Sequence, residues 1–142
     1  MRALWILALL LVGSTGISWA EVPAAPVQER PPEFRMAMDV ALTSLASAEA
    51  LKQVFRDPRP SGYGYGFPSG HTSVAFALAR VATEYHPKEK LLWYTLAAGV
   101  GYSRVRADAH DWDDVMAGAA LGGWIGDRTV GNGGMVLKHW EW

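Results

Sequence analysis

The sequence predicts an all-α domain, a compact helical bundle, and three observations support this. Four stretches have the apolar spacing and composition of helices, and short breaks rich in proline or glycine separate them. No run of alternating apolar and polar residues indicates a β-strand. The 142 residues suffice for one domain and include no cysteine, so the fold depends on its apolar core rather than on disulfides.

Two segments precede this domain. Residues 1–20 carry one charge, have a leucine-rich centre and end in Ser-Trp-Ala, which predicts a cleaved secretory signal peptide and a periplasmic protein. The alternative is that the uncharged residues 3–20 remain as an anchor in the inner membrane. Residues 21–34 contain four prolines and predict a linker, so the domain is expected over residues 35–142.

The first helix is predicted from Arg35 to Phe55. Two prolines at positions 58 and 60 then end it, because proline disfavours helical geometry in the residue before it. A loop rich in glycine and tyrosine follows over residues 61–67. The expected inward face of this helix consists of Met38, Leu42, Leu45, Ala48 and Lys52.

Three more helices are predicted at about 69–85, 88–105 and 109–128. The last two contain uncharged runs of 13 residues (91–103) and 12 residues (115–126), short of the roughly 20 needed to span a bilayer. We therefore interpret both as buried core helices.

A repeat of small residues predicts how the last helix packs. Gly118, Gly122 and Gly126 recur every four residues, which lets another helix approach closely. The expected partner is the small-residue face of the preceding helix, formed by Ala97, Ala98 and Gly101.

Unusual polar residues gather in three stretches, and together they suit one ligand, a phosphate group. Its negative charge requires fixed cations and hydrogen-bond donors, and the planar fork of arginine matches two phosphate oxygens. The start of a helix adds free N–H groups and the positive end of its dipole. Ser69 is expected to cap its helix or to turn its hydroxyl to the anion, and Gly70 to let the backbone approach. The candidate phosphate-binding residues are Lys52, Arg59, Ser69, Gly70 and Arg104.

Two histidines supply reactive groups. With an ordinary pKa of about 6.5, an imidazole can act as nucleophile, acid or base near neutral pH. His110 and Asp114 are four residues apart and would share one face of a helix. The carboxylate can then hold one ring nitrogen and aim the other at phosphorus. His71 is then free to protonate the leaving alcohol.

These residues form three motifs, Lys-x6-Arg-Pro, Pro-Ser-Gly-His and Ser-Arg-x5-His-x3-Asp. In this order they resemble the signature of the type 2 phosphatidic acid phosphatase and vanadium haloperoxidase superfamily, which includes bacterial class A non-specific acid phosphatases and membrane lipid phosphatases. The resemblance extends from Lys52 to about Gly126 and implies a helical bundle with the phosphate site at helix ends. The loop at 61–67 is shorter than in many relatives, which argues against an elaborate substrate-selecting loop.

The resemblance also implies a role for each site residue, and it implies no metal or other cofactor. His110 is implied as the nucleophile that becomes phosphohistidine, Asp114 as its orienting group and His71 as the general acid. The implied phosphate ligands are Lys52, Arg59, Arg104, Ser69 and the backbone at Gly70.

The sequence favours a phosphatase that hydrolyses soluble phosphate monoesters in the periplasm. The alternative substrate is a lipid phosphate or diphosphate, of the lipid A, phosphatidate or undecaprenyl type. Trp140 and Trp142, with the aromatic loop, would suit a peripheral contact with a membrane. The formal net charge of −1 gives no reason to expect nucleic acid as a partner, and the oligomeric state is not predicted.

Three other functions are weaker alternatives. The acidic run from Asp108 to Asp114 would suit a divalent-metal hydrolase, but no second cluster of ligands accompanies it. The intact set of acid, nucleophile and orienting group argues against a non-catalytic phosphate-binding module. A vanadate-dependent haloperoxidase shares the same cage but is generally much larger. His86 is expected to cap a helix end, and His139 is assigned no role.

Overall fold

The computed structural model describes residues 30–134, and the predicted signal peptide, most of the linker and the tail with His139 and both terminal tryptophans lie outside them. The described residues form α2 (Glu33–Phe55), α3 (Gly70–Tyr85), the short 3₁₀-helix η1 (Pro87–Glu89), α4 (Lys90–Arg106) and α5 (Trp112–Asn132). They contain no strand, only an isolated bridge between Pro58 and Tyr65. The predicted all-α class is confirmed.

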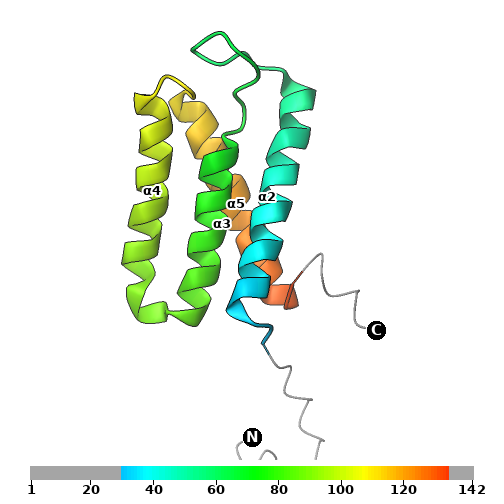
Figure 1. Ribbon diagram of the computed structural model, residues 1–142, viewed down its shortest axis with the longest axis vertical. Coiled ribbons are helices and arrows are strands. Elements are labelled where there is room, and N and C mark those ends of the chain that lie inside the picture. Colours follow the sequence, from blue (N-terminus) through cyan, green and yellow to red (C-terminus); the bar gives the residue numbers. More distant parts are fainter. Residues whose placement is uncertain (1–29, 135–142) are drawn as a thin grey trace, which may run out of the picture.

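Helix α3 is the centre of the bundle and packs against α2, α4 and α5. In Figure 1, α2, α3 and α4 stand side by side and α5 crosses behind them. The connection from α2 to α3 and the connection from α4 to α5 lie at the same end of the bundle. Two helix C-termini and two helix N-termini therefore meet at that end.

The buried face of α2 differs from the predicted one. Its buried residues include Met36, Val40 and Ser44, and the stripe continues at four-residue steps through Ala48 and Lys52. Ala48 and Lys52 are inside as expected, but Met38, Leu42 and Leu45 are exposed. The interface with α3 and α5 admits short side chains, so it receives serine and alanine and leaves the leucines outside.

Helix α4 is also less buried than predicted, whereas α5 is a core helix as expected. Only Ala97 and Gly101 of α4 are buried, and Leu91 is 82% exposed. The reason is position, because α4 lies at the edge of the bundle and most of its contacts are with α3 alone.

The glycine repeat of α5 produces the expected close approach, but to α3 rather than to α4. A Cβ atom built at Gly118 would lie 2.5 Å from the carbonyl oxygen of Ser69, and one at Gly122 would lie 2.0 Å from that of Ser73. At Gly126 it would lie 2.8 Å from the Cβ of Arg80. The central helix therefore occupies the groove that these glycines leave.

Two helix boundaries differ from the predicted ones. Helix α2 begins at Glu33, inside the predicted linker, and α5 begins at Trp112 rather than near residue 109. Asp111 is the N-cap of α5 and forms a capping box with Asp114, which satisfies free N–H groups of the first turn and starts the helix there. None of the helices within residues 30–134 is long and apolar enough to cross a membrane.

Candidate active site

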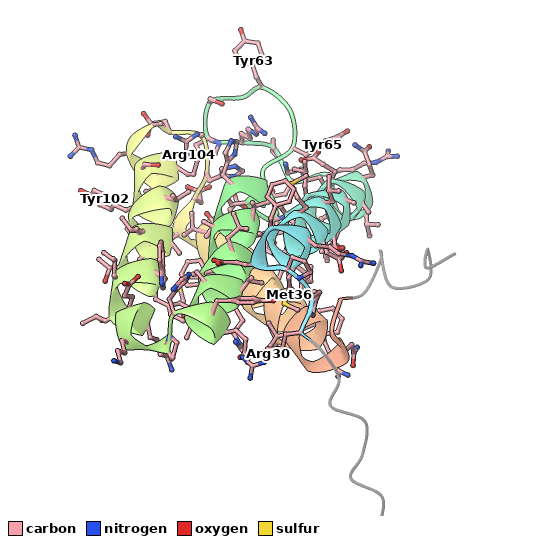
Figure 2. All side chains as sticks on the ribbon, turned by 60° about the horizontal axis from the view of Figure 1, so that its bottom comes forward. Arg30, Met36, Tyr63, Tyr65, Tyr102 and Arg104 are labelled. Atoms are coloured by element: carbon pink, nitrogen blue, oxygen red, sulfur yellow. The ribbon has the colours of Figure 1, made fainter. Side chains whose placement is uncertain are left out.

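All the predicted site residues lie at the end of the bundle where the four helix termini meet. Figure 2 shows Arg104 at this end, next to the loop that carries Tyr63 and Tyr65, with Met36 and Arg30 at the opposite end. Lys52 comes from the last turn of α2, and Ser69, Gly70 and His71 from the start of α3. Residues far apart in sequence are thus gathered by the antiparallel course of the helices.

His110 and Asp114 form a buried pair. The Nδ1 atom of His110 lies 3.0 Å from Oδ2 of Asp114, and both residues are 3% exposed. The pairing was predicted, but for a different geometry, because His110 lies in the connection before α5 and not on the helix. Oδ2 of Asp114 also accepts the backbone N–H of Asp111 at 3.3 Å. With its proton held on Nδ1, the imidazole keeps its lone pair on Nε2.

The surroundings of His110 lower its pKa from the ordinary histidine value. Burial is the largest cause, and the positive charges of Arg59 and Lys52 act in the same direction. The hydrogen bond and the charge of Asp114 raise the pKa, but they do not offset the burial. The imidazole is therefore neutral at neutral pH, which is the form a nucleophile requires.

Ser69 connects the start of α3 to the start of α5. It is fully buried, and its backbone N–H donates to the carbonyl oxygen of Asp114 at 2.9 Å. Its hydroxyl accepts a hydrogen bond from Oγ1 of Thr72 at 2.9 Å. The side chain makes no capping hydrogen bond, so of the two expected uses of Ser69 the N-cap bond is absent here. This serine orders the site through its backbone.

Gly70 lies beside Lys52. A Cβ at this position would be 3.7 Å from Nζ of Lys52 and 3.7 Å from the Cβ of Ala48, which are ordinary contacts. Protein packing alone therefore does not require glycine here. The same distances place the ammonium group of Lys52 next to the first turn of α3, where free N–H groups collect.

Lys52 has a partner that the sequence reasoning missed. Its side chain is buried, and Nζ lies 2.5 Å from Oε1 of Glu49, one turn earlier in α2. A buried ammonium without a counter-charge would be costly, and the carboxylate supplies one. The three-residue spacing of the two charges was the available signal. Since Glu49 is itself half-exposed, an incoming phosphate can take over its place beside Lys52.

Arg59 and the loop after it lie against the site. The Nε of Arg59 donates to the carbonyl oxygen of Tyr65 at 3.1 Å, and its backbone N–H donates to that of Gly64 at 3.1 Å. The loop then passes so near the His110–Asp114 pair that a Cβ at Gly66 would lie 2.6 Å from Oδ2 of Asp114. Gly66 is a second residue that sequence reasoning missed, and its signal was the glycine repeat of the loop.

Arg104 and His71 lie at the same end of the bundle, apart from the buried pair. Arg104 is half-buried in the last turn of α4, and its Nε donates to the hydroxyl of Ser103 at 3.3 Å. His71 is exposed in the first turn of α3. Neither forms a hydrogen bond to His110 in the part of the chain that the structure describes. Both side chains are at least partly open to solvent, so a ligand could reach them.

Two further observations concern residues outside the pair. His86 lies at the opposite end of the bundle, at the end of α3, with Nε2 3.2 Å from Oε2 of Glu33. Between residues 30 and 134, no group of three or more histidine, cysteine, aspartate or glutamate side chains could hold a metal ion.

Comparisons with known proteins agree with the motifs. The family model of the PAP2 superfamily matches residues 61–129. The chain is 43% identical over 56 residues to a bacitracin transport permease protein, BcrC, of Bacillus licheniformis, covering 39% of this chain and 28% of that protein. It is 39% identical over 83 residues to a lipid A 1-phosphatase of Porphyromonas gingivalis, covering 55% of this chain and 19% of that protein.

A lipid A 1-phosphatase of Rhizobium etli is 36% identical over 64 residues, 45% of this chain and 28% of that protein. The chain thus spans less than a third of the length of these curated relatives, and no solved structure matches it. The family match contains the Pro-Ser-Gly-His motif, Arg104 and the His110–Asp114 pair. The resemblance that the motifs predicted is therefore confirmed over residues 61–129, which match the PAP2 superfamily.

Proposed function

We propose that this protein is a phosphatase that removes the phosphate group of a lipid phosphate through a phosphohistidine intermediate. The observation that carries the proposal is the buried His110–Asp114 pair, whose imidazole is neutral and lies in the field of Lys52 and Arg59. Two of the relatives are named lipid A 1-phosphatases. Those names support a lipid substrate better than the soluble monoester that the sequence favoured.

In the proposed reaction, Lys52, Arg59, Arg104 and the N-terminus of α3 bind the phosphate oxygens. Nε2 of His110 attacks phosphorus, and the bond from phosphorus to the ester oxygen breaks. His71 gives its proton to the leaving oxygen, and Asp114 stabilises the positive charge on the imidazole. A water molecule then gives a proton to His71 and attacks the phosphohistidine, which releases phosphate and restores both histidines.

A lipid substrate also favours a membrane location for the chain. We therefore propose the second of the two sequence alternatives for the N-terminus, in which residues 3–20 anchor the protein with its site on the periplasmic side. Fractionation of cells that express the full chain tests this directly. Full-length protein in the membrane fraction is the expected result, and a soluble periplasmic protein that begins at Glu21 would contradict it.

The covalent intermediate is tested with labelled substrate. Rapid acid-free quenching of the wild type with a radiolabelled phosphate ester should trap label that is labile in acid and stable in base, as a phosphoramidate is. His110→Ala should remove both the label and the turnover while the helical circular dichroism spectrum is retained. Label on a serine or an aspartate would contradict the assignment of the nucleophile.

The substrate class is tested by catalytic efficiency. We expect kcat/KM of the full chain for a lipid phosphate in detergent micelles to exceed that for a water-soluble aryl phosphate by about a hundredfold, or roughly 2.7 kcal/mol of transition-state binding. Equal efficiencies, or a preference for the soluble ester, would contradict the lipid substrate and support a phosphatase of soluble monoesters instead.

A further inference from the structure

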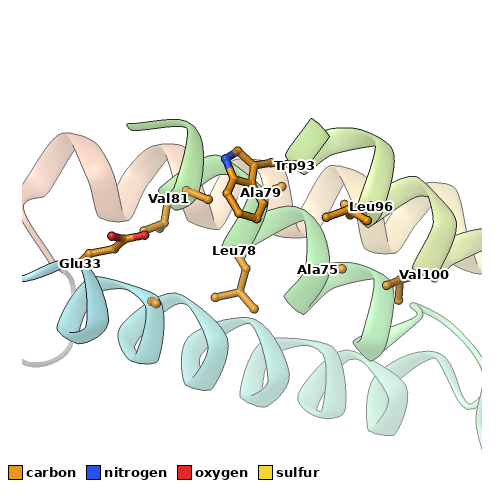
Figure 3. Close-up of a pocket in the computed structure, with 11 residues that line it drawn as sticks. Glu33, Ala75, Leu78, Ala79, Val81, Trp93, Leu96 and Val100 are labelled. Carbon is orange, nitrogen blue, oxygen red and sulfur yellow. The ribbon is translucent and has the colours of Figure 1, made fainter. Parts of the chain in front are cut away.

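An apolar groove runs along α3 between α2 and α4, away from the buried pair. Figure 3 shows this groove, whose volume is about 310 Å³. That size falls at the lower end of the range for ligand sites, about 300–1,000 Å³. The residues that form most of its wall are Ala37 of α2, Ala75, Leu78 and Ala82 of α3, and Leu96 and Val100 of α4.

The floor of the groove shares one face of α3 with His71. Steps of four, three and four residues lead from His71 to Ala75, Leu78 and Ala82, and residues at such spacing lie above one another on a helix. His71 occupies the first turn of α3, at the site end, and Ala75 lies one turn further along. The groove therefore begins one helical turn from the proposed general acid and continues away from it.

The α4 side of this groove is open in spite of its apolar character. Leu96 is 54% exposed on the α4 side of the groove. The α4 side of the groove belongs to a stretch, residues 91–103, that contains no charged residue. Exposed apolar surface of this kind indicates a binding site for an apolar partner.

We infer that this groove holds the apolar chain of the leaving group, so that one molecule has its phosphate in the cage and its hydrocarbon along α3. The inference rests on the proposed function, in which His71 protonates the oxygen between phosphorus and the leaving group. A hydrocarbon chain attached to that oxygen would begin next to His71. To enter the described groove, it would have to extend toward Ala75 and Ala82. The position of Ala75, one helical turn from His71 on the same face of α3, favours this occupant over a second copy of the protein.

The length of the groove limits the length of alkyl chain that it can hold. At a rise of about 1.5 Å per residue, Ala75 and Ala82 are about 10 Å apart along α3, and His71 and Ala82 about 16 Å apart. Substrates with longer chains should react more efficiently until the chain reaches the end of the groove. Each methylene that leaves water should raise kcat/KM about threefold to fourfold.

The test uses unbranched alkyl phosphates from ethyl upward, at concentrations where they remain monomeric. We would measure kcat/KM for the full chain, for Ala75→Phe near His71 and for Ala82→Phe at the far end. Ala120→Phe, an exposed alanine of α5 outside the groove, is the matched control. Circular dichroism would establish that each variant is folded.

In the wild type and in Ala120→Phe, efficiency should rise with chain length and then level off. In Ala82→Phe, kcat/KM should level off at a shorter alkyl chain. In Ala75→Phe most of the rise should be lost, so that the ratio of kcat/KM for a long-chain phosphate to kcat/KM for ethyl phosphate is at least tenfold lower than in the wild type. The same slope in all four proteins would overturn the inference. So would a uniform loss for every chain length in the groove variants, because a groove that selects chains cannot act on ethyl phosphate equally.

A binding measurement separates this inference from the proposed function. Alkylphosphonates, which are not hydrolysed, can be titrated into the wild type by calorimetry, and their affinity should increase with chain length whether or not the protein turns over any ester. Affinity that is independent of chain length would overturn the groove assignment even for an active phosphatase. A concentration-dependent dimer in sedimentation that Ala82→Phe dissociates, without any chain-length effect, would assign the groove to a second copy instead.

Discussion

Asp114 combines two tasks at the level of a single side chain. One of its oxygens accepts hydrogen bonds from Nδ1 of His110 and from the backbone N–H of Asp111. The same carboxylate therefore starts α5 and fixes the orientation of the imidazole. Gly66 makes this arrangement possible, because any larger residue would collide with that oxygen. The proposed nucleophile, His110, is thus positioned by a helix cap, which is a rigid part of the fold.

Asp114→Asn should lower the pKa of His110 further below its ordinary value. The aspartate charge and hydrogen bond both raise this pKa, so their loss leaves burial and the cations unopposed. The acid limb of kcat/KM should then move to lower pH, and kcat should fall by roughly a hundredfold to ten-thousandfold because the imidazole is misoriented. Titration of the imidazole by NMR and a pH–rate profile would measure both effects.

The matched control for this variant is Asp113→Asn, an exposed aspartate in the same helical turn. It should leave the pKa of His110 and kcat close to the wild-type values. A rise in the pKa of His110 in Asp114→Asn would contradict the orienting role.

His71→Ala should reduce turnover most for poor leaving groups. An aryl phosphate departs with little need of a proton, whereas an alkyl phosphate needs the general acid, so the loss for the alkyl ester should be larger by about a hundredfold. Steady-state rates for a matched pair of aryl and alkyl esters would test this. Equal losses on both esters would show that His71 serves binding or the loop and not proton transfer.

At the scale of elements, the contact between α3 and α5 sets the distance between the start of α3, which carries Ser69, and the start of α5, which carries Asp114. Gly118 and Gly122 of α5 face the carbonyl oxygens of Ser69 and Ser73 of α3 with no room for a Cβ. The same contact brings the backbone of Ser69 within hydrogen-bond distance of Asp114. Close helix packing and the geometry of the His110–Asp114 pair therefore depend on one another.

Two neighbouring glycines of α5 should respond in opposite ways to alanine. In Gly122→Ala the new Cβ would lie 2.0 Å from the carbonyl oxygen of Ser73, so the helices must move apart, at a cost of about 1–3 kcal/mol or more in the free energy of unfolding. In Gly123→Ala nothing lies within 4 Å of the new atom, and the better helix former should stabilise the protein by about 0.5–1 kcal/mol.

Urea unfolding followed by circular dichroism would measure both variants against the wild type. Equal effects of the two substitutions would mean that α3 and α5 are further apart than described here.

At the scale of the whole molecule, the fold brings three cations that are distant in sequence to one end of a nearly neutral chain. The formal net charge is −1, yet Lys52, Arg59 and Arg104 gather where the helix termini meet. The N-terminus of α3, next to Lys52, adds its own partial positive charge at the site itself. A phosphate can thus be bound by the protein alone, without a metal ion in the proposed reaction.

Activity should therefore survive removal of metal ions. Dialysis against a strong chelator, followed by assay in chelator-containing buffer, should leave kcat/KM within about twofold of the untreated value. A loss that added magnesium, manganese or zinc reverses would favour the divalent-metal hydrolase that the acidic run before α5 suggested.

The sequence by itself determined the helical class and the approximate helices, and it supplied the candidate site residues that the fold brings to one end of the bundle. Apolar spacing and proline breaks depend only on local geometry, so they can be read along the chain. The motifs were equally visible, because a phosphate needs cations, a helix start and an imidazole in any fold that binds it.

Only the tertiary structure decided which faces are buried and which partners meet. Spacing identifies a face of a helix but not the neighbour that covers it, so Leu42 was expected inside and is exposed, and the glycines of α5 meet α3 instead of α4. The cap at Asp111 moved His110 off the helix, although it stays within reach of Asp114. The groove below His71 depends on the placement of three helices, and such placement follows from packing across the bundle rather than from any local pattern.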